Sequence, residues 1–332
     1  MQKKNLFRLM VTAVICISAL LPLHVFAAQY KVLVVQSYEE TMPWVREINE
    51  GIEKILKDRC EIRYFYMDTK SSPEKGPQKA EAAFALYQEF QPHGVIVGDD
   101  NGQSMFVLPY LKDRVTVPVM FCGVNAEAEK YGYPAAHISG ILERHHFKEM
   151  IAFAKQFDPS VKTFAYMIKK SPVGEIILKQ IEKELETYSA KFVGYRMPET
   201  IKEAKAMAAE LSQQCDLLLL STLTGLKDDS AGAMPDKEAV PPVAEAFGKM
   251  VVGTEEQVLK AGALCSVIRT GQEQGAEAAK MLLKAMEGTP VSEIPVIRNR
   301  NGKRMINISV MKEMDITPRP EVLRGAQLVK TE

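Results

Sequence analysis

The stretch that decides the fold is residues 31–56, which read KVLVVQSYEETMPWVREINEGIEKIL. Residues 31–36 form a largely apolar run rich in β-branched side chains, which is typical of a buried strand. From residue 44 to residue 56 the apolar side chains recur at helical spacing. The stretch therefore predicts a strand, a turn and a helix, which is the opening unit of an α/β domain.

The same alternation continues through two series of elements. The first comprises strands at 61–67, 94–97 and 117–121 and helices at 78–90 and 104–111. The second comprises helices at 147–157, 173–188, 201–213 and 240–247 and strands at 163–168, 191–196, 216–221, 251–253 and 263–268. Continuous apolar strands separated by helices indicate parallel sheets covered on both faces. We therefore expect two α/β lobes, each a doubly wound parallel sheet, with ligands in a crevice at the carboxyl ends of the strands.

The C-terminal segment follows the second series but need not belong to the second lobe. It predicts a helix at 273–286 and short strands at 294–297 and 305–310 around a turn at 299–302. Because no long polar linker is present, we expect several short hinge strands to join the lobes. We place them near 138–142, 267–270 and 291–296.

Residues 1–27 have the pattern of a secretory signal peptide. Lys3, Lys4 and Arg8 precede an apolar run over 9–21, and Val25-Phe26-Ala27 supplies small residues at the cleavage site. The run has about 13 residues, fewer than the ~20 that span a bilayer. Cys16 lies too early for a lipoprotein cleavage site. We expect a periplasmic protein that is not a lipoprotein, in a compartment without ATP or NADH.

Composition limits the partners of the exported chain. Removing residues 1–27 leaves about 305 residues, the usual length of two α/β domains. The signal holds three of the 42 basic residues and no acidic one, so 39 basic face 42 acidic residues and nucleic acid is not an expected partner. Four cysteines lie beside or within apolar runs and are predicted to be buried thiols: Cys60, Cys122, Cys215 and Cys265. Export to an oxidising compartment would still allow one disulfide among them.

Polar and aromatic residues follow the first predicted strand. Ser37 and Tyr38 lie in the loop after it, and Trp44, the only tryptophan, opens the next helix. In this loop the rings can stack on a ligand, and free N–H groups at the helix start can hold a carboxylate. Trp44 has a second interpretation, which is packing against its own lobe.

Two acids and an amide follow the next strands of the first series. Asp99 and Asp100 come after the strand at 94–97, and Asn125 comes after the strand at 117–121. The carboxylates can accept hydrogen bonds from a ligand ammonium group, and Asn125 offers both a donor and an acceptor. Alternatively, one of the two acids caps the helix expected from residue 104.

The second series offers candidates at the corresponding turns. Ser171 directly precedes Pro172, so its side chain is expected to cap the next helix, with a ligand role in addition. Ser221, Thr222 and Glu255 follow two further strands and can present polar groups to the crevice. All of these residues are candidates for ligand binding.

Catalytic constellations are not recognisable in the sequence. It contains no Gly-x-Ser-x-Gly elbow, no Walker loop and no dinucleotide-binding glycine pattern. His145 and His146 are adjacent and would point in different directions on a helix. We expect no catalytic residue, no metal site and no cofactor.

Taken together, the chain resembles the periplasmic substrate-binding proteins of ABC transporters, with the type 1 periplasmic-binding fold. The branch it resembles includes proteins for tryptophan and tyrosine uptake. The resemblance extends from about residue 31 to 328 and lies in the order and spacing of several stretches, each shared with that branch. These are residues 36–44, 118–125, 139–143, 282–297 and 307–318.

The resemblance implies two lobes joined by three hinge crossings. Residues 28–142 and 269–292 would form the first lobe, and residues 143–268 and 293–332 the second. It also implies a monomer that captures a small organic solute, such as an amino acid or related carboxylate with an apolar or aromatic portion, and delivers it to an ABC permease in the inner membrane.

Two other functions remain open at this point. The first loop also resembles extracellular sensor domains of histidine kinases and diguanylate cyclases, so a periplasmic sensing subunit that partners a membrane kinase is the alternative. A secreted enzyme is a third hypothesis, which the lack of a recognisable nucleophile and base weakens.

Overall fold

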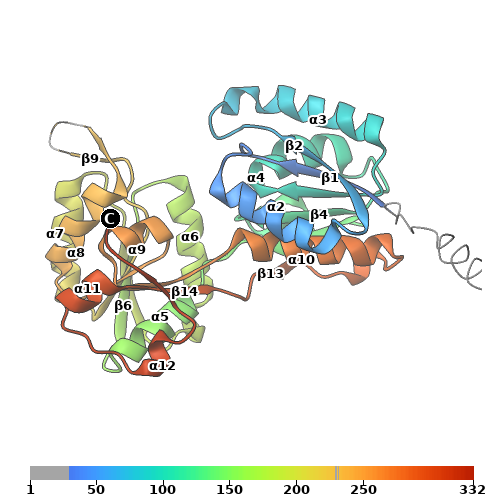
Figure 1. The fold of residues 1–332 in the computed structure, drawn as a ribbon. Coiled ribbons are helices and arrows are strands. Elements are labelled where there is room, and N and C mark those ends of the chain that lie inside the picture. The colour runs from blue at the N-terminus through green and yellow to red at the C-terminus, as the bar shows by residue number, and fades with distance from the viewer. Residues whose placement is uncertain (1–29, 229, 231) are drawn as a thin grey trace, which may run out of the picture.

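The computed structural model describes residues 30–228, 230 and 232–332. The predicted signal peptide lies outside these residues. Figure 1 shows two α/β lobes that lie side by side and are joined by several chain segments. Each lobe is built on its own sheet, as the alternating pattern predicts.

The first sheet has the strand order β13-β5-β4-β3-β1-β2, and its paired strands are parallel. Its strands are β1 (Tyr30–Gln36), β2 (Cys60–Tyr66), β3 (Gly94–Gly98), β4 (Val119–Val124), β5 (Ile138–Leu142) and β13 (Ile297–Arg298). The accompanying helices are α2 (Pro43–Leu56), α3 (Gly76–Phe90), α4 (Asp99–Gly102), the π-helical η2 (Gln103–Leu111) and α10 (Gly271–Met286), with short 3₁₀ turns η1 (Pro73–Lys75), η3 (Ala128–Tyr131) and η5 (Val291–Glu293).

The second sheet has the order β15-β14-β12-β11-β8-β6-β7, and its strands are parallel except where β14 pairs with β12. Its strands are β6 (Thr163–Met167), β7 (Lys191–Arg196), β8 (Leu217–Leu220), β11 (Met250–Gly253), β12 (Cys265–Ile268), β14 (Lys303–Asn307) and β15 (Gln327–Val329). The helices are α5 (Phe147–Phe157), α6 (Pro172–Lys183), α7 (Ile201–Ser212), α8 (Asp236–Phe247), α9 (Glu256–Gly262), α11 (Ile308–Glu313) and α12 (Pro320–Leu323), with the 3₁₀ turn η4 (Leu185–Thr187) and a small hairpin of β9 (Leu226–Lys227) and β10 (Ala233–Met234).

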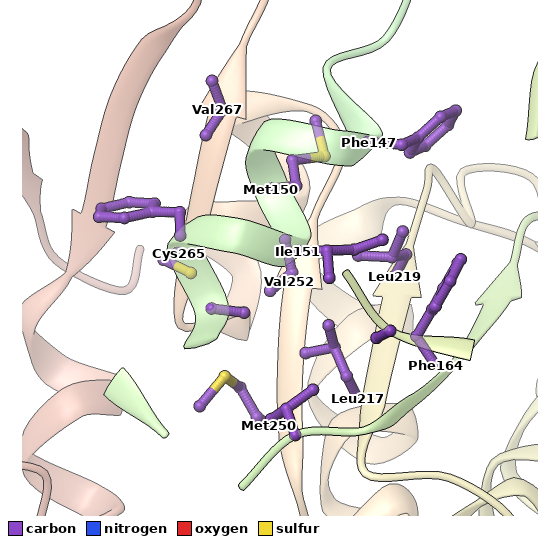
Figure 2. Close-up of a cluster of buried hydrophobic side chains, with 14 of the residues drawn as sticks. Phe147, Met150, Ile151, Phe164, Leu217, Leu219, Met250, Val252, Cys265 and Val267 are labelled. Carbon is purple, nitrogen blue, oxygen red and sulfur yellow. The ribbon is translucent and has the colours of Figure 1, made fainter. Parts of the chain in front are cut away.

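Apolar side chains cover both faces of each sheet. In the second lobe, residues of α5 pack on side chains from β8, β11 and β12, as Figure 2 shows for Phe147, Ile151, Leu219 and Val252. The opposite face packs against α7, α8 and α9. Burial on both faces is the reason that these strands are continuous apolar runs. Cys60, Cys122, Cys215 and Cys265 are buried in these cores as free thiols.

Helix α10 follows the second sheet in sequence but packs on the first lobe. A Cβ atom at Gly275 would lie 2.0 Å from the Ile48 carbonyl oxygen, and one at Gly51 would lie 2.2 Å from the Gln272 carbonyl oxygen. Glycine is therefore required at both positions, because the backbones of α2 and α10 touch. The close packing returns the chain to the first lobe and creates the second of three crossings.

The three crossings meet in one polar cluster. The first follows β5, the second joins β12 to α10 at residues 269–270, and the third joins β13 to β14 at residues 299–302. The buried Asn299 side chain accepts from the Arg144 backbone N–H at 2.7 Å and donates to the Arg144 carbonyl oxygen at 2.9 Å. The Arg269 guanidinium donates to the Glu143 carboxylate. Side chains of the second and third crossings thus bind the first.

Some sequence-based boundaries were wrong. The helix expected at 104–111 occurs as η2, but the short helix α4 before it, which begins at Asp99 directly after β3, was not predicted; Asp99 adopts a left-handed φ of 59° there. The third crossing was expected near 291–296, and the second lobe from residue 293. However, β13 pairs with β5 in the first sheet, so the chain leaves that sheet only after Arg298. The strand expected at 305–310 ends at Asn307, whose side chain caps α11. Helix α9 was not predicted.

Replacing Asn299 with alanine should lower the free energy of unfolding by about 2 kcal/mol, because it leaves the buried Arg144 N–H and carbonyl groups without partners. The measurement is the shift of the urea midpoint at constant slope. Asn301→Ala is the matched control, since the exposed Asn301 side chain donates to Glu273 at the surface, and its effect should stay below about 0.5 kcal/mol. Equal effects of the two substitutions would contradict the role assigned to Asn299.

Candidate ligand-binding site

Buried polar atoms without a partner mark the carboxyl ends of strands in both lobes. Among the described residues these atoms are Gln36 Oε1, Asp99 Oδ2 and the Tyr166 hydroxyl oxygen. Gln36 ends β1, Asp99 directly follows β3, and Tyr166 is the next-to-last residue of β6. Such atoms are rare in folded proteins because each costs free energy, and they call for an explanation.

Asp99 is held rigidly at the end of β3. Its Oδ1 accepts from the Trp44 indole N–H at 3.2 Å, while Oδ2 has no partner. Gly123, with φ 67°, lets β4 approach closely, since a Cβ atom there would lie 3.1 Å from Asp99 Oδ1. Burial raises the pKa of the Asp99 carboxyl well above its usual value, and the negative charge of Glu143 raises it further.

Asp100, by contrast, is fully engaged within the first lobe. Its Oδ1 accepts from the Tyr131 hydroxyl at 2.6 Å, and its Oδ2 accepts from the Asn125 backbone N–H at 2.9 Å. The Asn125 side chain donates to Glu143 at 3.1 Å. Neither Asp99 nor Asp100 caps a helix at residue 104, because both lie inside α4 after Gly98. The capping interpretation was therefore wrong.

The first loop and the helix start contribute one fully buried and two half-buried residues. Ser37 is fully buried, donates to the Gly98 carbonyl at 2.7 Å and accepts from the Gly102 N–H at 2.7 Å, so its hydroxyl joins β1 to α4. Trp44 packs partly against the first-lobe core while its N–H binds Asp99. Tyr38 is half-buried, with the Lys70 ammonium 5.7 Å from its ring centre. Burial raises the pKa of the Tyr38 hydroxyl, with Asp99 adding to the effect.

In the second lobe, Ser221 and Glu255 come together. The Ser221 hydroxyl lies 2.9 and 3.1 Å from the two Glu255 oxygens, and the Thr254 hydroxyl donates to Glu255 at 2.6 Å. Burial raises the pKa of Glu255, against the opposing effect of Arg269. This largely buried pair places polar groups at the ends of β8 and β11.

Thr222 and Ser171 are held by local structure. The Thr222 hydroxyl donates to Asp236 at 2.8 Å, and the Leu223 N–H donates to the same carboxylate at 2.6 Å. Ser171 accepts from the Gly174 N–H at 3.1 Å, which confirms the predicted cap of α6. A cavity of about 400 Å³ beside Ser171 is lined by Lys169, Lys170, Ser171, Glu175, Glu199, Gly225 and Lys227.

Arg269 was not identified from the sequence, although it connects the two halves of the site. Its guanidinium binds Glu143 and lies within electrostatic range of Glu255 and Tyr166. The negative charge of Glu143 in turn raises the pKa of Asp99. A signal existed, because Arg269 is a charged residue directly after an apolar strand at an expected hinge. Asp236, which binds Thr222, was also missed, and its signal in the sequence was weaker: an acid that opens a helix directly after Pro235.

A second cavity, of about 340 Å³, lies between the lobes, and of the ligand-binding candidates from the sequence only Asn125 lines it. First-lobe residues Asn125 and Glu127 line it, together with Arg144 of the first crossing and Ile176 and Lys183 of α6. Lys183 and Glu127 form an ion pair across it at 2.8 Å. Figure 1 shows α6 on the side of the second lobe that faces the first.

The described residues lack two further features. Over residues 30–228, 230 and 232–332, no three or more His, Cys, Asp and Glu side chains are grouped so that they could hold a metal ion. Within the same residues no helix has the length and apolar character needed to cross a bilayer.

Comparison with solved structures finds the same fold in binding proteins. A ligand-free, open substrate-binding protein with adhesive properties from Clostridium difficile superposes with a TM-score of 0.70 at 16% identity, covering 91% of this chain and 100% of that one. The ABC domain from Streptococcus pneumoniae in complex with L-tryptophan gives 0.57 at 16% identity over 90% and 99%. A periplasmic ribose ABC transporter protein from Conexibacter woesei gives 0.51 at 17% identity over 87% and 96%. No curated protein matches the sequence.

These likenesses confirm the predicted type 1 periplasmic-binding fold. The model of one family, described as ABC transporter substrate binding protein, matches residues 42–330, which is most of the chain. The family is one of substrate-binding proteins. The chain belongs to the ABC transporter substrate-binding protein family.

Proposed function

We propose that this protein is exported to the periplasm, captures a small organic solute between its two lobes and delivers it as a monomer to an ABC permease of the inner membrane. It performs no chemistry on the solute. The observation that carries the proposal is the placement of unpartnered buried polar atoms at strand ends in both lobes. A solute that contacts both sets of strand ends supplies the missing partners and stabilises the closed arrangement.

The solute is an amino acid or a related compound with an apolar or aromatic portion. Tyr38 and Trp44 offer flat apolar surface in the first lobe. In the second lobe, Lys170 is already paired with Glu199, but Lys169 lies beside the start of α6, where its charge and the helix dipole favour a carboxylate. The two lobes thus offer groups of different chemistry to one ligand.

The decisive experiment identifies the solute and measures closure. Native mass spectrometry of protein purified from its own host should detect a bound small molecule. When that molecule is removed and added back at saturation, the radius of gyration from X-ray scattering should decrease, since contacts to both lobes favour the closed state. At a hundredfold excess over its dissociation constant it should also stabilise the protein by about 2.7 kcal/mol. An unchanged radius in protein shown to bind would contradict closure.

Replacing Tyr38 with alanine should weaken binding of the same molecule by roughly tenfold, because the half-buried ring is removed from the crevice side of the first loop. Titration calorimetry measures the loss. Tyr195→Ala is the matched control, because this tyrosine lies exposed on β7. The Tyr195→Ala protein should bind the molecule with the affinity of the unmodified protein. Unaltered affinity of Tyr38→Ala would remove Tyr38 from the site.

A further inference from the structure

The two neighbouring acids after β3 differ in what they can still bind. Asp100 accepts from the Tyr131 hydroxyl and from the backbone N–H groups of Asn125 and Ala126, so both of its oxygens are occupied. Asp99 uses one oxygen for the Trp44 N–H and keeps the other free of any partner. The sequence left the choice between these two acids open, and the contacts favour Asp99.

The position of Asp99 is energetically unfavourable in the ligand-free protein. The side chain is 3% exposed, and a buried carboxyl oxygen without a partner destabilises the fold. The left-handed φ of 59° adds backbone strain for a residue other than glycine. Strain and an unmet hydrogen bond at one crevice residue are expected where a ligand completes the site.

We propose that Asp99 Oδ2 receives the ammonium group of the bound solute, which makes Asp99 the residue that selects amines over neutral or purely anionic compounds. The inference rests on the proposed function. Trp44 fixes the carboxylate through its N–H, and Tyr38 lies within electrostatic range of it. The ammonium supplies the hydrogen bond that Oδ2 lacks, and its charge balances a carboxylate held among other acids.

The surroundings of Asp99 favour a cation. Two negative groups act on it: Glu143 from the end of β5 and Asp100 from α4. Lys70, from the loop after β2, has the opposite effect. The neighbouring Tyr38 hydroxyl and the Cys122 thiol of β4 have pKa values raised by burial and remain neutral near pH 7. Since burial and the two acids also raise the pKa of Asp99, a proton occupies its carboxyl more readily in the ligand-free protein.

This proton gives the proposal a distinctive pH dependence. An amine binds the ionised carboxylate, so its affinity should increase as the pH rises through the Asp99 pKa and should level off above it. A carboxylate without an amine would show the opposite slope. A purely structural Asp99 would produce neither slope.

The test compares Asp99→Asn with Asp113→Asn. Asparagine keeps the shape and an acceptor for Trp44, and it tolerates left-handed backbone. Asp113 has the same φ of 59° but is exposed, so it controls for the substitution itself. Calorimetry would titrate each protein with a panel of tyrosine, tyramine, hydroxyphenylpropionate, leucine and ribose, and with the molecule found by native mass spectrometry, from pH 5 to 9.

We expect the ligands that bind to carry an amine, and Asp99→Asn to weaken them by about 10- to 100-fold and abolish the pH slope. Asp113→Asn should match the unmodified protein. Tight binding of ribose or hydroxyphenylpropionate, or amine binding that Asp99→Asn leaves unchanged, would overturn the inference. The proposed function as a solute-binding protein would still hold. If neither the panel nor the purified protein reveals any bound solute, the proposed function fails and the inference with it.

Discussion

The buried ion pair between Glu143 and Arg269 is the interaction on which the arrangement of the two lobes depends. Glu143 belongs to the first crossing and Arg269 to the second, and both side chains are largely removed from water. Breaking such a pair by removing one partner typically costs about 3–5 kcal/mol, because the remaining charge stays buried. The pair therefore holds the first and second crossings next to each other. Each lobe keeps its own apolar core.

The same pair connects the halves of the candidate site. On one side Glu143 accepts from Asn125, whose backbone holds Asp100. On the other, Arg269 moderates the pKa of Glu255. The negative charge of Glu143 raises the pKa of Asp99, so the proposed ammonium site and the hinge pair are electrostatically coupled. In the proposed function, recognition and closure share one set of neighbouring charged and hydrogen-bonded residues.

Local pattern was sufficient for the elements whose own sequence specifies them. The helix Phe147–Phe157 and the strand Lys191–Arg196 occur with the bounds that their periodicity predicts. The cap at Ser171 was likewise predictable from the sequence, because a serine before a proline caps its own helix and needs no partner from elsewhere in the chain. The start of α4 was not, since it depends on a left-handed Asp99 that is supported by Trp44 and by the close approach of Gly123.

The sequence by itself determined the two largely parallel sheets, the strand-end loops that carry polar residues and the family resemblance, because these follow from periodicity and the order of motifs along the chain. Only the tertiary structure decided that Asp100 is occupied while Asp99 keeps a free oxygen. It alone showed that Arg269 and Asn299 bind the first crossing. The physical reason is that these contacts join residues more than a hundred positions apart, or depend on which oxygen a neighbouring strand reaches, and no local pattern encodes either.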